Sequence, residues 1–195
     1  MVLDHVQDVN ECLDKQTQPE PLRLLLLGTA GSGKTRAVQT VLQELQRALA
    51  TVNLPAQVDR AAFVRLGAPT GTAAFNLRFQ ATTIHRLIHW FRPPYFGELS
   101  SGEALYRLQK HLERTHLLIL DEMSMIGRQM MGRIDSRMQQ AKAGQSGANE
   151  VLGGVSSVLV GDPAQCEAIR DQQIYDTVPH KRTAGEHDQQ HVQLS

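Results

Sequence analysis

The sequence predicts an α/β fold with a mainly parallel sheet flanked by helices. Short apolar segments alternate with segments in which apolar residues recur at helical spacing, and this alternation is typical of parallel strands joined by helices. The first apolar segment, residues 22–27, is followed by the glycine-rich loop Gly28–Thr35 and then by a helical pattern. A strand, a glycine loop and a helix in this order are the context in which G-x-x-x-x-G-K-[ST] binds phosphate.

The apolar segments predict four strands, at residues 22–27, 61–66, 117–120 and 155–160. The first segment is nearly continuous in apolar residues, as expected of a strand buried on both faces of a parallel sheet. Ligands of such sheets bind outside the carboxyl ends of the strands. The segments that directly follow these strands are therefore the candidate site.

Helices are expected where apolar residues recur every three or four positions. The predicted helical segments are 3–13, 38–50, 105–112 and 130–141, with shorter helices opening near Thr72 and Thr83. The Thr83 hydroxyl is expected to cap the helix that it opens, because a side-chain oxygen at that position accepts from a free backbone amide. Residues 142–154 are glycine-rich and are expected to be flexible.

Length and composition limit the domain count and the partners. The chain has 195 residues, and we assign 1–175 to one domain and 176–195 to a loosely ordered polar tail. Its 20 basic and 20 acidic residues cancel, so a nucleic-acid site has to be local. No segment is apolar and long enough to span a membrane, and the N-terminus resembles no signal peptide. We expect no membrane partner and an intracellular location, nuclear or mitochondrial in a eukaryote and cytoplasmic otherwise.

The glycine loop has the residues that a phosphate site needs. Glycines let several backbone N–H groups turn toward one anion, and the N-terminus of the following helix adds positive potential. Lys34 is expected to reach the β- and γ-phosphates of a nucleotide, and the Thr35 hydroxyl to bind Mg²⁺. The alternative is an ordinary glycine-rich turn that ends in Lys-Thr. The predicted nucleotide-binding residues are Gly28, Thr29, Ala30, Gly31, Ser32, Gly33, Lys34 and Thr35.

Two more strand ends carry polar motifs. Asp121-Glu122 directly follows the strand at 117–120. There Asp121 is placed to hold Mg²⁺ opposite Thr35, and Glu122 to orient or deprotonate an attacking water. Gln165 ends the motif Gly-Asp-x-x-Gln after the last strand, where its amide is placed to contact the γ-phosphate and that water. The alternatives are a pair of solvated acids and a simple polar turn. Because the carboxyl ends of parallel strands share one edge, the three motifs should converge.

In this order the motifs resemble superfamily-one DNA helicases, in particular the PIF-one-like branch, which is itself similar to RecD-type and Helitron helicases. The resemblance covers about residues 20–175 and rests on the segments Gly28–Thr35, Pro69–Ala74, Thr83–His85, Asp121–Ile126 and Gly161–Gln165. It implies a RecA-like P-loop NTPase domain, the first of two motor domains. It also implies ATP hydrolysis with Mg²⁺ and 5′–3′ movement along single-stranded DNA, in DNA repair, recombination or telomere maintenance.

The resemblance implies roles for individual residues. It makes Lys34, Glu122 and Gln165 the catalytic residues, and it makes Thr35 and Asp121 the metal ligands. No other metal is expected, because the histidines and cysteines show no metal-ligand spacing.

A separate group of residues matches the DNA-binding elements of the family. Pro69, Thr70 and Gly71 match the segment that contacts the DNA backbone, where amides and hydroxyls suit a sequence-independent site. His85 matches an element near the DNA path. A histidine that caps a helix or packs at the edge of the core is the alternative for His85.

The chain also departs from the family pattern. Where the family commonly has a Leu-Pro-Pro-like stretch after its third motif, this chain has Cys166–Ile169. An adenine-reading glutamine motif ahead of the phosphate loop is not evident. No residues remain for the second RecA-like domain, which supplies arginines to the γ-phosphate. We therefore expect the first motor domain alone, as a fragment or a truncated gene product with weak activity.

Two other functions stay open. A phosphate-loop ATPase or kinase of another class would share the loop and the acidic pair with a helicase. A transposon-derived helicase fragment would bind nucleotide, or nothing, and would catalyse no reaction. The intact set Lys34, Thr35, Asp121, Glu122 and Gln165 argues against decay of the site, but it does not replace the second domain.

Overall fold

The computed structural model describes residues 20–51, 59–91, 95–100 and 102–176. In these ranges the strands are β1 (Arg23–Leu27), β2 (Val64–Ala68), β3 (Thr82–Thr83), β4 (Leu117–Leu120) and β5 (Ser156–Gly161). The α-helices are α2 (Lys34–Thr51), α3 (Gly71–Leu77), α4 (Ile84–Leu87), α5 (Glu103–Leu112) and α6 (Arg128–Lys142). Three short 3₁₀-helices are η1 (Arg60–Phe63), η2 (Met123–Met125) and η3 (Val151–Gly154). The helix predicted at 3–13 lies outside the described residues, as does the tail predicted at 176–195 apart from Asp176.

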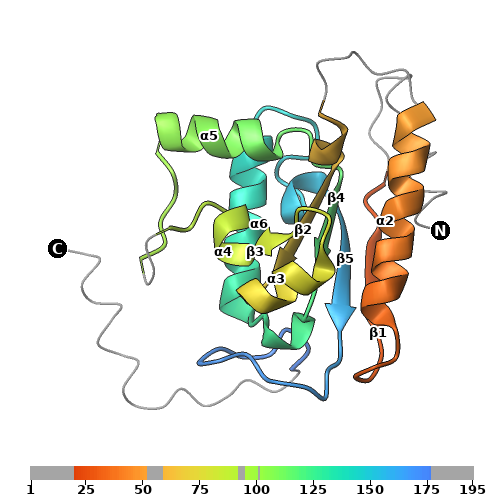
Figure 1. Ribbon diagram of the computed structural model, residues 1–195. Helices are drawn as coiled ribbons and strands as arrows, with labels where there is room; N and C mark the ends of the chain where they lie inside the picture. The colour runs from red at the N-terminus through yellow and green to blue at the C-terminus, as the bar shows by residue number, and fades with distance from the viewer. Residues whose placement is uncertain (1–19, 52–58, 92–94, 101, 177–195) are drawn as a thin grey trace, which may run out of the picture.

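The strands form one five-stranded sheet between two layers of helices (Figure 1). The strand order is β1-β5-β4-β2-β3, and every neighbouring pair is parallel. All carboxyl ends therefore lie at the same edge of the sheet, which is its lower edge in Figure 1. The predicted α/β class with a mainly parallel sheet is confirmed.

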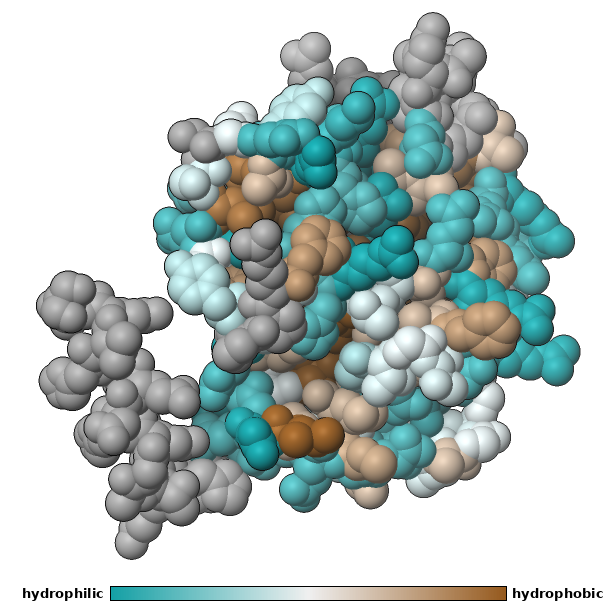
Figure 2. All heavy atoms as spheres, turned by 60° about the vertical axis from the view of Figure 1, so that its left-hand side comes forward, coloured by the Kyte–Doolittle hydropathy of each residue, from teal (hydrophilic) through white to brown (hydrophobic). Residues whose placement is uncertain are grey.

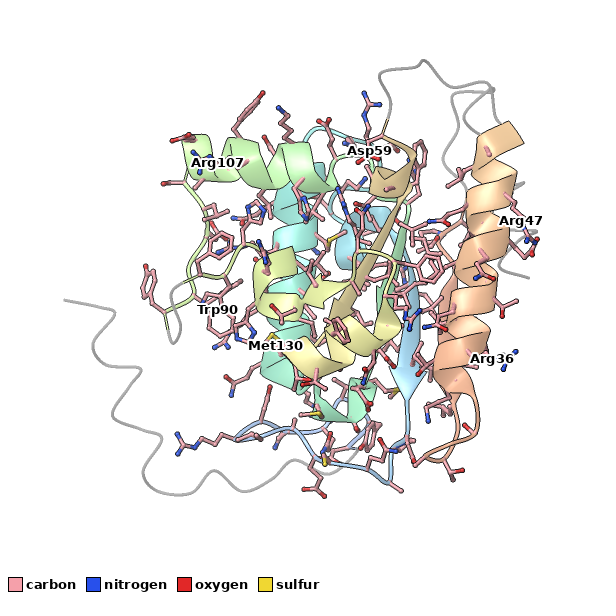
Figure 3. The ribbon with its side chains drawn as sticks, viewed as in Figure 1. Arg36, Arg47, Asp59, Trp90, Arg107 and Met130 are labelled. Carbon is pink, nitrogen blue, oxygen red and sulfur yellow. The ribbon has the colours of Figure 1, made fainter. Side chains whose placement is uncertain are left out.

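One face of the sheet is covered by α2 and α3. Leu42 and Leu45 of α2 are at most 3% exposed and belong to one buried cluster with Leu77 of α3. The helical spacing that predicted α2 is thus the spacing of its buried face. The opposite face of α2 is mostly polar, and Figure 3 shows Arg36 and Arg47 pointing away from the sheet.

The other face is covered by α4, α5 and α6 (Figure 1). Leu108 of α5 and Ile134 and Met138 of α6 are fully buried in one cluster with Leu118 and Leu120 of β4. Successive residues of a strand point to opposite faces of the sheet. The residues of β4 that alternate with Leu118 and Leu120 therefore pack in the α2 layer. On the outside, Figure 2 shows hydrophobic side chains in separate areas among hydrophilic ones. None of the helices in the described ranges is long and apolar enough to cross a membrane.

The expectation that the first strand is buried on both faces is wrong. In the described sheet β1 is an outer strand whose neighbour is β5. Leu24 and Leu26 point into the α2 layer and are partly buried. Leu25 and Leu27 point to the other face and are 57% and 49% exposed, because the layer of α4, α5 and α6 packs over β4 instead.

The second strand begins later than predicted, at Val64 rather than at residue 61. The Asp59 carboxylate accepts from the amide of Ala61 at 3.0 Å and thereby starts η1, which takes up the first residues of the apolar segment. At its other end β2 runs to Ala68 and so includes Gly67, beyond the predicted end at residue 66. A Cβ at Gly67 would lie 3.0 Å from side-chain carbons of Leu87 and Leu120, so a glycine is needed where α4 approaches the sheet.

Two threonine caps fix the helices that follow β2 and β3. The Thr70 hydroxyl accepts from the amide of Ala73 at 3.2 Å and begins α3. The Thr83 hydroxyl accepts from the amide of Arg86 at 3.4 Å and begins α4, as predicted. The short strand β3 just before α4 was not predicted, because two residues carry no periodic signal.

The expectation of flexibility is wrong for the end of the segment 142–154. Leu152 in η3 is 1% exposed, and its amide donates to a carboxylate oxygen of Asp135 in α6 at 2.6 Å. Leu152 reaches this position with a left-handed backbone, at φ 57°. The turn is therefore packed against α6 and leads directly into β5.

Candidate functional site

The candidate site lies at the carboxyl edge of β1, β5 and β4, which are neighbours in that order. The amide of Gly28, the first residue after β1, donates to the carbonyl of Gly161 at the end of β5 at 3.2 Å. The amide of Asp121, the first residue after β4, donates to the carbonyl of Gly67 in β2 at 2.9 Å. These bonds extend the sheet by one residue into the motifs. The predicted convergence of the three strand ends is thus confirmed.

The phosphate loop has the backbone that its glycines predict. Gly31 and Gly33 have φ values of +75° and +89°, in the left-handed region that favours glycine. A Cβ at Gly28 would lie 2.6 Å from the Ser32 hydroxyl oxygen, so a larger residue there would displace the Ser32 side chain. The Lys34 ammonium donates to the carbonyls of Gly28 at 2.6 Å and Thr29 at 3.0 Å, which holds it over the loop.

Thr35 and Asp121 supply the oxygen atoms that suit a magnesium ion. Thr35 is half-buried in the first turn of α2, and Asp121 is only 6% exposed at the end of β4. Burial raises the pKa of the Asp121 carboxyl, while the Glu122 amide, which donates to it at 3.0 Å, and the charge of Lys34 lower that pKa. A hydroxyl and a carboxylate are hard ligands of the kind that Mg²⁺ prefers. Within the described ranges no group of three or more His, Cys, Asp or Glu residues is arranged to hold a metal ion.

Glu122 has an unusual backbone for a residue of its type. Its φ and ψ are 53° and 49°, a left-handed conformation that costs a residue with a Cβ about 1–3 kcal/mol. Burial raises the pKa of its carboxyl, and the negative charges of Asp121 and Asp162 raise it further against the effect of Lys34. A carboxyl with a raised pKa is better suited to accept a proton near neutral pH.

Gln165 lies in the turn that follows β5. Its backbone amide donates to the backbone carbonyl of Asp162 at 3.1 Å, and the Asp162 carboxylate accepts from the backbone amide of Ala164 at 3.0 Å. Asp162 is 7% exposed and, as an acid whose field reaches Glu122, belongs to the site. The sequence shows Asp162 within a motif but gives it no role, because a buried acid in a turn has no periodic signature.

The DNA-binding residues predicted after β2 lie beside the phosphate site along the same edge. Thr70 and Gly71 are exposed at the start of α3, and Pro69 is half-buried. They follow β2, which neighbours β4 and therefore Asp121. Their backbone is held by the cap that Thr70 makes to Ala73.

His85 lies in α4, which follows β3, and β3 is at the opposite side of the described sheet from β1. Its ring stacks on Trp90 with centroids 4.6 Å apart and 14° between the planes. The Arg133 guanidinium lies 4.3 Å from the centroid of the Trp90 ring, whose position is labelled in Figure 3. Burial and the Arg133 charge lower the pKa of His85. These contacts favour the alternative of a histidine packed at the edge of the core.

The comparisons with known proteins identify the family. The model of the AAA domain matches residues 11–192. Comparison with curated protein sequences gave no significant match. Among solved structures the chain is similar to the Pif1 helicase of Bacteroides sp. in complex with ADP-AlF4, at 27% identity, with a TM-score of 0.54 and coverage of 86% of this chain and 33% of that chain. It is also similar to the Candida albicans Pif1 helicase, at 21% identity, with a TM-score of 0.56 and coverage of 84% and 33%.

A third match is to Pif1 helicases described at forked double-stranded DNA, at 24% identity, with a TM-score of 0.57 and coverage of 86% of this chain and 35% of that chain. The chain thus spans about a third of the length of the solved helicases that it matches. Matches below 25% identity support the fold, and the family model covers almost the entire chain. The chain therefore belongs to the AAA domain family, and its RecA-like P-loop fold and its similarity to PIF-one-like helicases are confirmed.

Proposed function

We propose that this chain binds and hydrolyses Mg-ATP as the first motor domain of a DNA helicase. The observation that carries the proposal is that the phosphate loop and the acidic pair directly follow β1 and β4, which lie on either side of β5 with their carboxyl ends at one edge of the sheet. The phosphate loop and the acidic pair therefore face the same site. A Bacteroides Pif1 helicase has been solved with ADP-AlF4, which supports nucleotide binding at this site.

Each residue of the site has a distinct role in this proposal. The loop amides and Lys34 bind the phosphates, while Thr35 and Asp121 hold Mg²⁺. The ion supplies charge neutralisation of the phosphate oxygens. Glu122 orients the attacking water and accepts its proton, for which its raised pKa is suited. Gln165 contacts the γ-phosphate and transmits its presence to the DNA-binding elements.

The DNA-binding part of the proposal concerns the segment after β2. Pro69, Thr70 and Gly71 supply exposed backbone and hydroxyl groups, which suit contacts to phosphates irrespective of sequence. A Bacteroides Pif1 helicase has been solved bound to single-stranded DNA, which supports this partner. His85 is the weakest member of the set, because its ring is stacked on Trp90. Movement in the 5′–3′ direction, and roles in repair, recombination or telomere maintenance, are further parts of the proposal that rest on the resemblance.

The proposal includes a second RecA-like domain, because the chain spans about a third of the similar helicases. Arginines supplied by a partner domain accelerate phosphoryl transfer by about 10³- to 10⁵-fold. Turnover by the 195-residue chain alone should be slower than that of a two-domain motor by such a factor.

The decisive experiment measures nucleotide binding and turnover in the same samples. A fluorescent ATP analogue is titrated with and without Mg²⁺, and hydrolysis is followed under single-turnover conditions with and without single-stranded DNA. Lys34→Ala should abolish binding, while Lys110→Ala, on the exposed face of α5, should not. Stimulation by DNA separates a helicase motor from a phosphate-loop ATPase of another class. Binding without turnover at any protein concentration would identify an inert relative and overturn the proposal.

A further inference from the structure

The segment after Gln165 folds back against the N-terminus of α6. The Asp171 carboxylate accepts from the amides of Gln129 at 3.0 Å and Met130 at 3.2 Å. Gly127 precedes α6 without a side-chain cap of its own, and a Cβ there would lie 2.2 Å from the Asp171 carboxylate. The first turn of α6 is therefore capped by a residue that lies about forty positions away along the chain.

The same segment reaches η2 through Gln173. Gln173 is 6% exposed, and its backbone forms an antiparallel bridge with Gly127. In the orientation of its amide that satisfies both neighbours, the side chain donates to the carbonyl of Ser124 at 2.6 Å and accepts from the amide of Ala168 at 3.0 Å. Ser124 is the central residue of η2 and is fully buried. The side chain of Gln173 thus bonds η2 to the chain that follows β5.

Glu122 lies at the N-terminus of η2. The carbonyl of Glu122 accepts from the amide of Met125 at 3.0 Å, so Glu122 is the N-terminal residue of this turn. Its left-handed backbone persists only where the surroundings hold it. On the other side of η2, a Cβ at Gly161 would lie 2.8 Å from the amide nitrogen of Met123, so η2 lies directly against β5. The direction of the Glu122 side chain therefore depends on contacts that fix η2 from two sides.

We propose that Gln173 is a positioning residue for Glu122, acting through its hydrogen bond to the Ser124 carbonyl. The inference rests on the proposed function, because it assumes that Glu122 acts on the attacking water. It implies that the segment following Gln165 and the turn carrying Glu122 move as one unit. A displacement of that segment would then change the alignment of the Glu122 carboxylate without changing the phosphate loop.

The test compares Gln173→Met with Gln172→Met. Methionine keeps the length of glutamine but cannot donate to Ser124 or accept from Ala168. At the neighbouring position the side chain of Gln172 is half-buried, and its amide oxygen accepts from the Arg128 guanidinium at 3.4 Å, a long bond at the surface, so Gln172→Met is the matched control. Gln173→Met should lower single-turnover hydrolysis by about 10- to 100-fold, the loss typical of a misaligned reacting group, while leaving the dissociation constant of the ATP analogue unchanged.

A second readout does not depend on activity. Hydrogen exchange of the backbone amides in residues 122–127 should become faster in Gln173→Met than in wild type and in Gln172→Met, while exchange in α2 stays the same. If the wild type binds ATP but does not turn it over, the proposed function fails and exchange alone decides the inference. Equal losses in the two variants, a loss of ATP binding, or unchanged exchange in 122–127 would overturn the role of Gln173.

Discussion

The backbone amide of Gly28 donates to the carbonyl of Gly161 at 3.2 Å, which joins the start of the phosphate loop to the end of the last strand. Gly161 also lies against η2, the turn that carries Glu122. Two residues without functional side chains therefore set the relative positions of the phosphate loop, Glu122 and the Gln165 turn. The same relation predicts where small changes of the backbone should disturb the site.

Gly161→Ala should destabilise the protein, by about 1–3 kcal/mol, because the added Cβ would lie 2.8 Å from the backbone nitrogen of Met123. Gly132→Ala is the matched control. Gly132 is exposed in α6, and a Cβ there would meet nothing within 4 Å. Alanine should stabilise that helix by about 0.5–1 kcal/mol. Urea unfolding of the two variants measures both effects, and a neutral Gly161→Ala would contradict the packing described for η2.

Glu122→Gln should separate binding from hydrolysis. The amide keeps the size of the side chain but cannot take a proton from water, so turnover should fall by about 10²- to 10⁴-fold while ATP-analogue binding persists. Glu103→Gln serves as the control, since Glu103 is exposed and forms an ion pair with the exposed Arg107 on α5, away from the site. Single-turnover assays on the three proteins decide the point. Full activity in Glu122→Gln would remove Glu122 from the catalytic role.

Thr70 should affect stability and DNA binding by different routes. Thr70→Ala removes the cap of α3 and should cost about 1 kcal/mol, whereas Thr70→Asn keeps a capping oxygen and most of that stability. If the Thr70 hydroxyl also contacts DNA, both variants should bind a labelled single-stranded oligonucleotide more weakly than wild type. The exposed neighbour Thr72, changed to alanine, should leave binding unchanged. Wild-type affinity in both Thr70 variants would argue against the contact.

Acid should destabilise the fold through His111. Burial, followed by the positive charges of Arg65 and His89, lowers the pKa of His111 from 6.5 to about 4. Between those values His111 binds a proton in the unfolded chain but not in the folded chain. The contribution of neutral His111 to the free energy of unfolding is therefore fully present above pH 6.5 and is lost as the pH falls toward 4. His85 and His89 also have lowered pKa values and act in the same direction.

The measurement is the free energy of unfolding in urea at several pH values from 7.5 to 4.5. His111→Gln removes the titrating group, so its stability should fall less steeply with acid than that of wild type. The two curves should differ most below about pH 6, where the unfolded wild-type histidine is charged. Parallel curves for the two proteins would show that His111 titrates alike in both states.

The parts of the site that the sequence predicted are those encoded locally. The phosphate loop depends on glycines at fixed positions and on the strand and helix beside it, and all of these are adjacent in the chain. Asp121 and Glu122 follow a strand whose four residues are all buried, which is an equally local signal. Thr83 was predictable as a cap because its partner, Arg86, is three residues away.

The features that sequence reasoning missed depend on contacts between distant segments. The acid that caps α6, Asp171, lies 41 positions from Met130, and no spacing rule connects the two. The prediction that β1 is buried on both faces was wrong because the apolar pattern does not determine strand order. A central strand and an outer strand can have the same pattern. The predicted start of β2 was wrong because Asp59 caps a 3₁₀-helix that contains the first residues of the apolar segment.

The strand order has a consequence for the synthesis of this protein. Of the strands in the described sheet β1 is made first, and it pairs with β5, which is made last; Arg23 lies opposite Ser157, 134 positions away along the chain. Contacts between such distant residues form late, because the loop between them has to close first. The apolar residues of β1 therefore leave the ribosome well before their partner strand exists. During that interval, which is about 7–30 s at usual elongation rates, they are a target for chaperones, and the phosphate loop is among the last parts of the domain to become ordered.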